Sequence, residues 1–218
     1  MTVPNETARA RSDWTPAWRA LGFTAVAFAL ACVIDPWVYE HVSDPKVYAR
    51  DWGRLLRVIG FLGTWVALAV AVALHEGAEP ARRAIARQRA WLLFGSAALG
   101  GLVAEVGKLL LRRERPQAHD GLYGFRDFAD RTWSTAGLAL PSSHTLVAFA
   151  GAAMLARLYP RARWVGYTLA VGCAVTRVMA RAHFVSDVTL AAGLGWIVAF
   201  VLTRRWSAAD HAVRSAKT

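Results

Sequence analysis

The sequence predicts an all-α membrane protein, a bundle of six transmembrane helices. Hydrophobic residues make up 56% of the 218 positions and ten residues are Trp, and the mean hydropathy of +0.29 is high for a soluble domain of this length. The apolar residues also occur in blocks rather than in stripes with the period of a helix, so the segments have little polar surface to offer to water. The alternative is six short helices buried in a soluble core, and this patterning disfavours it.

Six apolar runs are candidates for membrane-spanning helices. Each lies near the length of about 17–25 residues that a spanning helix needs, with the fourth at the short end. The first run follows a polar arm that has no small-residue cleavage site in the usual place, so we expect it to be retained rather than removed as a signal peptide. The runs are 17–34, 57–75, 90–111, 143–159, 162–180 and 185–203.

The segments between and around these runs complete the predicted organisation. We expect an N-terminal arm at 1–16, a six-span domain at 17–203 and a basic tail at 204–218. Pro36 is expected to end the first helix, and the aromatic and charged residues of 46–56 are typical of a segment that lies along the membrane surface.

Two further features are the long loop 112–142 and the cysteines. The loop is too long for a simple connection, and its aromatic residues favour a functional cap. Cys32 and Cys173 each lie inside an apolar run, where we expect buried free thiols rather than a disulfide or a metal site.

The distribution of positive charge predicts the orientation in the membrane. The formal net charge is +11, and 14 of the 26 Lys and Arg lie on the side that holds both termini, the loop 76–89 and the turn 157–163. Because Lys and Arg favour the cytoplasmic side, both termini are predicted to be cytoplasmic, and 35–56, 112–142 and 177–187 to face outward. The margin is small, so the reverse orientation is the alternative. We interpret the basic surplus as a topology signal and a contact for anionic lipid headgroups, not as a nucleic-acid footprint.

The first polar cluster is KLLLRRERP, residues 108–116. Lys108 and Arg115 are seven residues apart, which places them on one face of a helix, and Pro116 disfavours helix at Arg115. Two long cations therefore converge on one anion in this interpretation. The alternative is a pair of side chains that extend from the end of a membrane helix to the interface.

The second cluster is PSSHT, residues 141–145, at the start of the fourth run. Pro141 followed by Ser142 and Ser143 is typical of a helix start, whose free backbone N–H groups and positive dipole end bind anions. His144 projects from the same turn. The alternative is an ordinary helix cap with an interfacial histidine.

The third cluster is TRVMARAHFVSDVTL, residues 176–190. His183 and Asp187 are four residues apart, so the carboxylate is expected to hydrogen-bond the imidazole and fix its tautomer. Arg177 lies six residues before His183, which predicts a break between the fifth and sixth helices. A His–Asp pair that satisfies itself is the alternative, but ionisable residues at membrane depth are costly and favour a functional role.

Together the three clusters suit a tetrahedral phosphate. Three cations and a helix N-terminus need an anion, and two histidines allow one to attack phosphorus while the other protonates the departing oxygen. The carboxylates do not cluster as Mg²⁺ requires, so we predict phosphoester hydrolysis without a metal or other cofactor, with the cations neutralising the transition state.

The three motifs resemble those of the type 2 phosphatidic acid phosphatases, membrane relatives of vanadium haloperoxidases and bacterial acid phosphatases. The family pattern is K-x6-R-P, P-S-G-H and S-R-x5-H-x3-D, and here it reads K-x6-R-P from Lys108, P-S-S-H from Pro141 and T-R-x5-H-x3-D from Thr176. The resemblance extends over 17–203. Ser143 stands where the family usually has Gly, and Thr176 where it usually has Ser.

The resemblance implies a role for each matched residue. His183 is similar to the nucleophile that forms a phosphohistidine, Asp187 to the residue that orients it, and His144 to the general acid. The residues that resemble the family's phosphate clamp are Lys108, Arg115, Ser142, Ser143 and Arg177.

The resemblance also implies an inner-membrane enzyme that acts on a phosphorylated lipid. Family members act on phosphatidylglycerol phosphate, undecaprenyl diphosphate, phosphatidic acid or lipid A phosphates, and we expect residues 117–140 to choose among them. Transfer of the phosphoryl group to an acceptor lipid is a second hypothesis. An anion carrier is a third, and the gathering of polar groups on one face disfavours it, apart from Glu105, which we expect to pair with Lys108. The sequence assigns no oligomeric state.

Overall fold

The computed structural model describes residues 14–215, with side chains up to Trp206. Most of the predicted N-terminal arm and the last three residues of the predicted tail lie outside the described residues. Within the described range the regular secondary structure is helical, apart from two isolated β-bridges. The all-α prediction is confirmed.

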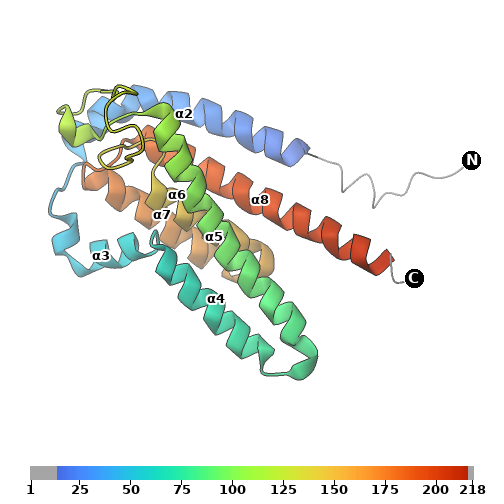
Figure 1. Cartoon of the computed structure of the whole chain (residues 1–218). Coiled ribbons are helices and arrows are strands. Elements are labelled where there is room, and N and C mark those ends of the chain that lie inside the picture. Colours follow the sequence, from blue (N-terminus) through green and yellow to red (C-terminus); the bar gives the residue numbers. More distant parts are fainter. Residues whose placement is uncertain (1–13, 216–218) are drawn as a thin grey trace, which may run out of the picture.

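Five of the six predicted apolar runs each coincide with one long helix, and the second run is divided between α3 and α4 (Figure 1). Short helices precede, join or follow them, and one of these, α3, becomes important for the site. The helices are α2 (Thr15–His41), η1 (Val47–Ala49), α3 (Asp51–Val58), α4 (Leu62–Gly77), η2 (Pro80–Arg82), α5 (Arg83–Leu111), η3 (Pro116–Ala118), α6 (Ser143–Leu158), η4 (Pro160–Ala162), α7 (Arg163–Met179) and α8 (Val185–Ser215).

Helix α6 is the centre of the bundle. It packs against α5, α7 and α8, while α2 covers α8, α4 lies along α5 and α3 lies on α7. The buried face of α6 is rich in Ala and Gly, and small side chains let helices approach closely. The buried small residues of α6 are Ala148, Ala150, Gly151, Ala152 and Ala153.

The outer surfaces of the helices are apolar. Phe23 and Val33 on α2 are each 77% exposed, and Leu74 on α4 is 71% exposed, which suits a hydrocarbon environment rather than water. By length and composition, α2, α5 with η2, and α8 are able to cross a membrane, and α3 with α4 passes the same test as a pair bent by 68°. Helix α6 is apolar but shorter. The protein is therefore a membrane protein with three such helices, or four if the bent pair counts as one span, in the described part of the chain.

Three boundaries differ from the sequence predictions. Pro36 does not end the first helix, which continues to His41. The proline cannot donate to the carbonyl of Cys32 one turn earlier, and the hydroxyl of Tyr123 donates to that carbonyl instead, at 3.2 Å.

The second predicted span, 57–75, is not one helix. It breaks between α3 and α4, so its first residues belong to the short surface helix. At the other end of the chain, α8 passes through the predicted domain boundary at 203 without a break.

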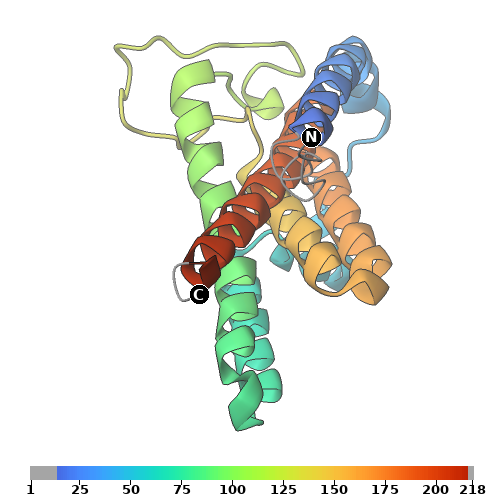
Figure 2. The same cartoon turned by 90° about the vertical axis from the view of Figure 1, so that its right-hand side faces the viewer.

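The helix ends bring the three polar clusters to one end of the bundle. Helices α5 and α7 end there and α6 and α8 begin there, and Figure 2 shows the loop 112–142 spread over this end. Helix α2 begins and α8 ends at the opposite end (Figure 1). Segments that are far apart in sequence therefore meet.

Candidate active site

The Lys108 cluster forms at the end of α5. Arg112 adopts a left-handed conformation (φ 56°) and ends the helix after Leu111. Arg115 therefore lies in the loop, and the predicted helical face shared by Lys108 and Arg115 is wrong. The chain leaves the helix at Arg112 instead, and the N–H of Arg115 donates to the carbonyl of Gly137 at 3.1 Å.

Lys108 is held by groups from two helices. Its ammonium donates to Glu105 at 2.9 Å and to the hydroxyl of Ser143, and that hydroxyl donates to Glu105 at 2.6 Å. The predicted pairing of Glu105 with Lys108 is confirmed. The side chain of Ser143, which the usual Gly lacks, joins the end of α5 to the start of α6.

The start of α6 has the predicted cap. Ser142 is the N-cap residue, and its hydroxyl accepts from the N–H of Thr145. Ser142 is fully buried, so the first turn of α6, which carries His144, faces the interior of the cluster rather than open solvent.

Arg115 and Arg177 lie close to Lys108 without a carboxylate of their own. The charges of both arginines act on Lys108, and burial, followed by the charges of Arg177 and Arg57, lowers the pKa of Arg115. Arg177 is 5% exposed, and its Nη1 donates to the hydroxyl of Tyr48 at 3.1 Å. The Nε atoms of Arg115 and Arg177 are buried and have no hydrogen-bond partner. Since buried polar groups are rarely left unpaired, these two guanidinium groups have hydrogen-bonding capacity left for an acceptor.

His183 lies in the predicted break between α7 and α8, and Asp187 lies in the first turn of α8. Their closest atoms, Nδ1 and Oδ2, are 3.6 Å apart, which is too long for a hydrogen bond, and Nδ1 has no other partner. Asp187 Oδ2 instead accepts from the N–H of Phe184 at 2.8 Å. Burial lowers the pKa of His183 to about 4, although Asp187 opposes this. The imidazole is therefore neutral near pH 7, as a nucleophile must be.

Arg113 is a site residue that the sequence analysis missed. Its guanidinium pairs with Asp187 Oδ1 and donates to the hydroxyl of Ser186 at 2.8 Å. Both members of the ion pair are buried, at 3% and 0% exposure. Arg113 therefore fixes the carboxylate beside His183.

A second buried carboxylate supports this arrangement from α2. Asp35 accepts from the N–H of Ser186 at 3.1 Å and from the hydroxyl of Tyr123 at 2.7 Å. A signal was available in the sequence, because a carboxylate inside an apolar run is costly unless it has a partner. The partner itself lies 151 residues away in the chain.

Two of the same cations, Arg177 and Lys108, act electrostatically on both histidines. The charges of Arg177, Arg57, His183 and Lys108 all act on His144, and the charges of Arg177 and Lys108 act on His183. All eight predicted site residues thus lie at one end of the bundle. The structure brings their charged members together from α5, α6, α7, α8 and the loops between them.

Two buried arginines hold the loop 112–142. The guanidinium of Arg112 donates to the carbonyls of Asp127, Asp130 and Thr132, and Arg126 donates to Glu114 and to the carbonyl of Ala136. The pKa of the Glu114 carboxyl is lowered, mainly because His119 donates a hydrogen bond to it. The loop therefore has a defined shape over the site.

No group of three or more His, Cys, Asp or Glu side chains that is arranged to hold a metal ion occurs among the residues that the structure describes. The groups gathered at the site are cations, hydroxyls, two imidazoles and a helix N-terminus, which are groups that bind an anion.

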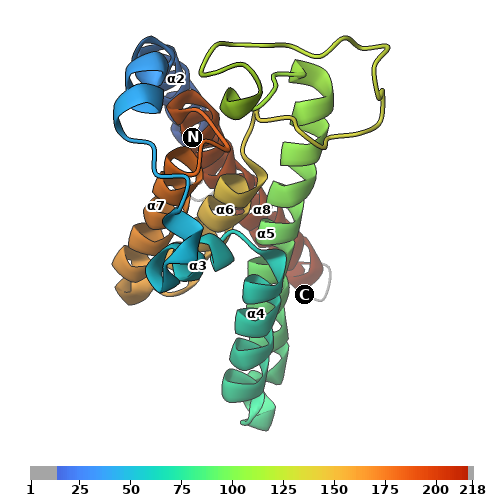
Figure 3. The same ribbon diagram turned by 90° about the vertical axis from the view of Figure 1, so that its left-hand side faces the viewer.

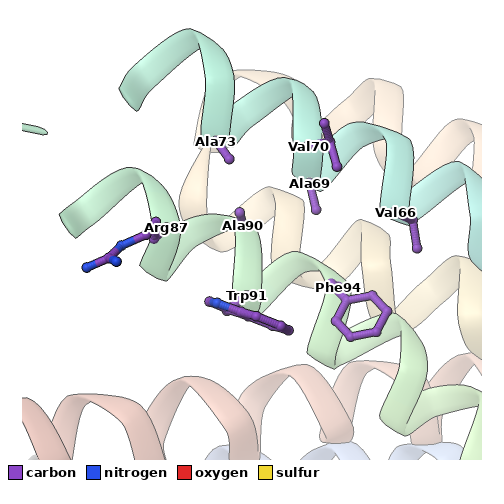
Figure 4. Close-up of a pocket in the computed structure, with 8 residues that line it drawn as sticks. All are labelled: Val66, Ala69, Val70, Ala73, Arg87, Ala90, Trp91 and Phe94. Atoms are coloured by element: carbon purple, nitrogen blue, oxygen red, sulfur yellow. The ribbon is translucent and has the colours of Figure 1, made fainter. Parts of the chain in front are cut away.

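An apolar groove of about 330 Å³ lies between α4 and α5 (Figure 4). It is distinct from the polar cluster, because Trp91 in its wall precedes Lys108 by 17 residues of continuous helix, which is roughly 25 Å. Its lining residues are Val66, Ala69, Val70, Ala73, Arg87, Ala90, Trp91 and Phe94.

A second apolar groove, of about 390 Å³, lies beside the polar cluster. Among its lining residues, Val178 directly follows Arg177, and Val188 directly follows Asp187. Other lining residues come from α2, including Ile34 and Val38. We refer to it below as the α2–α7–α8 groove.

Comparisons with known proteins agree with this arrangement. A family model described as the PAP2 superfamily matches residues 89–210, more than half of the chain. A lipid A 1-phosphatase of Rhizobium etli is 29% identical over 195 residues, which cover 82% of this chain and 81% of that protein. A lipid A 1-phosphatase of Rhizobium johnstonii is 36% identical over 104 residues, which cover 47% of this chain and 42% of that protein.

A solved structure has a similar fold. The crystal structure of a transmembrane PAP2-type phosphatidylglycerolphosphate phosphatase from Bacillus subtilis matches with a TM-score of 0.56 and 19% identity, over 86% of this chain and 94% of that one. At this identity the likeness concerns the fold alone.

The apolar helices and the match to the PAP2 superfamily define the class of this protein as a membrane phosphatase. The chain belongs to the PAP2 superfamily. The resemblance found in its motifs is confirmed.

Proposed function

We propose that this protein hydrolyses the phosphate of a membrane lipid through a phosphohistidine intermediate on His183. The observation that carries the proposal is the gathering of three cations beside two histidines and the start of α6. Lys108, Arg115 and Arg177 converge from separate helices and loops, and two buried guanidinium Nε atoms have no partner. A phosphate bound there supplies the missing acceptors.

In the proposed mechanism, His183 attacks phosphorus and the P–O bond to the lipid breaks. His144 gives a proton to the departing oxygen, and water then releases phosphate from His183. Lys108, Arg115, Arg177, Ser142 and the N–H of Ser143 stabilise the charge of the transition state. Asp187 orients His183 once the imidazole moves within hydrogen-bond distance, and Arg113 positions Asp187.

Two observations support a lipid as the substrate. The site lies where apolar helices end, and the α2–α7–α8 groove runs beside it and offers an apolar surface to an acyl chain. We further propose that all six long helices cross the membrane, with α3 on its surface, in a bacterial inner membrane. In this topology the termini are cytoplasmic and the site faces outward.

The relatives favour lipid A carrying a 1-phosphate as the first substrate to test, since both are lipid A 1-phosphatases. Phosphatidylglycerol phosphate, phosphatidic acid and undecaprenyl diphosphate complete the panel. Purified protein is incubated with each lipid in EDTA and released phosphate is measured. We expect release from at least one lipid, and complete loss of activity on chelation contradicts the proposed metal-independent mechanism.

The same panel separates hydrolysis from phosphotransfer. Hydrolysis yields free phosphate in proportion to the dephosphorylated lipid. Transfer to an acceptor hydroxyl yields a new phosphorylated lipid and little free phosphate, which is detected by mass spectrometry of the lipid fraction.

A further inference from the structure

Arg57 on α3 is a cation for which the three sequence motifs assign no role. The nearby arginines are paired, Arg50 with Asp44 at 2.9 Å and Arg54 with Asp51. Among the residues that the structure describes, no carboxylate lies within ion-pair distance of Arg57. Its guanidinium lies instead over the ring of Tyr48, 4.9 Å from the ring centroid.

Helix α3 holds Arg57 in a fixed position beside the site. Figure 3 shows α3 beside α6 and α7. At the end of α3, Gly60 touches the first turn of α6 so closely that an added Cβ would lie 2.6 Å from the Cβ of His144. Leu56 packs against Gly172 of α7 in the same way. The backbone at position 57 is therefore fixed relative to His144, while the side chain of Arg57 is exposed.

Tyr48 connects Arg57 to the proposed phosphate clamp. The guanidinium of Arg177 lies 5.8 Å from the centroid of the same ring and donates to its hydroxyl. That hydroxyl donates to the carbonyl of Thr176 at 3.0 Å. Arg57 and Arg177 thus share one aromatic ring between them.

Arg57 precedes Gly60 by three residues, and Gly60 packs against His144, the residue proposed to protonate the leaving group. The charge of Arg57 acts on Arg115 and on His144. In the proposed mechanism His183 attacks from one side, and His144 protonates the oxygen that leaves from the other.

The charge balance leaves Arg57 without a role in binding one phosphate. Lys108, Arg115 and Arg177, less the charge of Glu105, carry two positive charges, while Arg113 balances Asp187. A phosphomonoester carries about −1.5 to −2 at neutral pH, so the clamp is matched without Arg57. The inner phosphate of a diphosphate adds one further negative charge on the leaving side.

We propose that Arg57 binds the inner phosphate of a lipid diphosphate and makes the site prefer diphosphate over monophosphate headgroups. This inference rests on the proposed function. His183 attacks the terminal phosphorus and the bond to the bridging oxygen breaks. The electron pair stays on the lipid monophosphate, which takes the proton of His144, and water then cleaves the P–N bond to release inorganic phosphate. Arg57 stabilises the lipid monophosphate as it leaves.

Binding of two soluble anions tests the proposal without catalysis. The probes are inorganic phosphate and methylenediphosphonate, which has no cleavable P–O–P bond, titrated calorimetrically into the detergent-solubilised full chain. We expect the wild-type protein to bind the diphosphonate at least about tenfold more tightly, and Arg57→Ala to lose this preference. Equal affinities in the wild-type protein, or a preference retained in Arg57→Ala, overturns the proposal.

Kinetics with farnesyl diphosphate and farnesyl monophosphate give the matching result for catalysis. Arg57→Ala is expected to lower kcat/KM for the diphosphate by about tenfold to a hundredfold and for the monophosphate by less than about threefold. Arg57→Lys restores part of the loss, and Arg54→Ala on the same helix is the control that leaves both rates unchanged. Equal loss on both substrates makes Arg57 a general clamp residue and refutes the proposal.

The two failures are distinguishable. If the wild-type protein releases phosphate from no lipid, the proposed function fails, and the binding experiment still decides the role of Arg57. If phosphate is released but the anions bind equally, the proposed function stands and the inference about Arg57 is wrong.

Discussion

The two ends of the helix bundle differ in how their arginines are paired. At the end where α4 meets α5, Arg89 donates to both oxygens of Glu76, at 2.8 and 2.9 Å, and the hydroxyl of Tyr159 donates to the same carboxylate. At the other end, Arg115 and Arg177 have buried Nε atoms with no partner. Arg89 has a carboxylate partner within the described part of the chain, whereas Arg115 and Arg177 do not.

This difference separates structural charges from functional ones. A buried guanidinium without a partner does not stabilise the fold, because removing a charge from water is costly unless a partner compensates. These cations gather around two histidines and a helix N-terminus, and in the proposed mechanism their partner is the phosphate of the substrate. The contrast would not be visible from charge composition alone, since arginines occur at both ends.

The largest effect is expected from removing the proposed nucleophile. His183→Ala should lower phosphate release by at least about 10⁴-fold, because the covalent pathway is lost. The rate is measured with the best lipid of the substrate panel. The matched control is His75→Ala at the opposite end of the bundle, which should retain activity within about twofold, and comparable losses in both variants would mean that the ends do not differ in the way described.

The next effect concerns stability. Arg113→Ala leaves the fully buried Asp187 without its partner and should cost about 3–5 kcal/mol of unfolding free energy. Arg89→Ala breaks a pair whose side chains are 37% and 20% exposed, so its cost should be nearer to about 1 kcal/mol. Denaturant unfolding in detergent compares the two variants, and equal costs would show that Asp187 has another stabilising partner.

Removing an unpaired cation should affect activity rather than folding. Arg177→Ala should lower kcat by about 10²–10³-fold, the usual cost of losing one group that stabilises transition-state charge. The thermal stability of this variant should not fall, because the substitution removes one of several like charges that lie close together. A stability loss as large as that of Arg113→Ala, with kcat unchanged, would mean that Arg177 stabilises the fold rather than the transition state.

The smallest effect is expected at the position where this chain departs from the family pattern. Ser143→Gly removes the hydroxyl that accepts from Lys108 and donates to Glu105. The loss of one hydrogen bond to a charged group should change kcat/KM by about tenfold or less. Steady-state kinetics of this variant, with Ser143→Ala as the control for backbone freedom, show whether Ser143 holds the lysine. A loss equal to that of Arg177→Ala would mean that Ser143 contacts the substrate directly.

The sequence predicts much of the fold because hydropathy and helix signals are local. The runs of apolar residues coincide with the long helices, and the cap at Ser142 and the break before His183 occur where expected. The prediction that Pro36 ends the first helix is wrong. The carbonyl of Cys32, to which the proline cannot donate, accepts instead from the hydroxyl of Tyr123, which lies 91 residues further along the chain. A local rule has no access to such a contact.

The candidate site is predictable only as far as its motifs reach. Lys108, His144 and His183 stand out in the sequence by residue type and spacing, whereas Arg113 is one of several arginines in a basic run. Its pairing with Asp187 crosses 74 positions of the chain. Arg57 and Tyr48 belong to a surface segment whose approach to the site depends on how α3 packs. These contacts are set by tertiary packing, not by local pattern.

The most direct test is to trap the phosphorylated enzyme. Purified protein is mixed with a lipid substrate labelled in its phosphate, quenched within milliseconds in alkali, which preserves phosphohistidine, and digested for mass spectrometry. The account predicts label on the peptide that contains His183 and none in His183→Ala. Label on another residue, or rapid phosphate release with no labelled protein at any time, would contradict it.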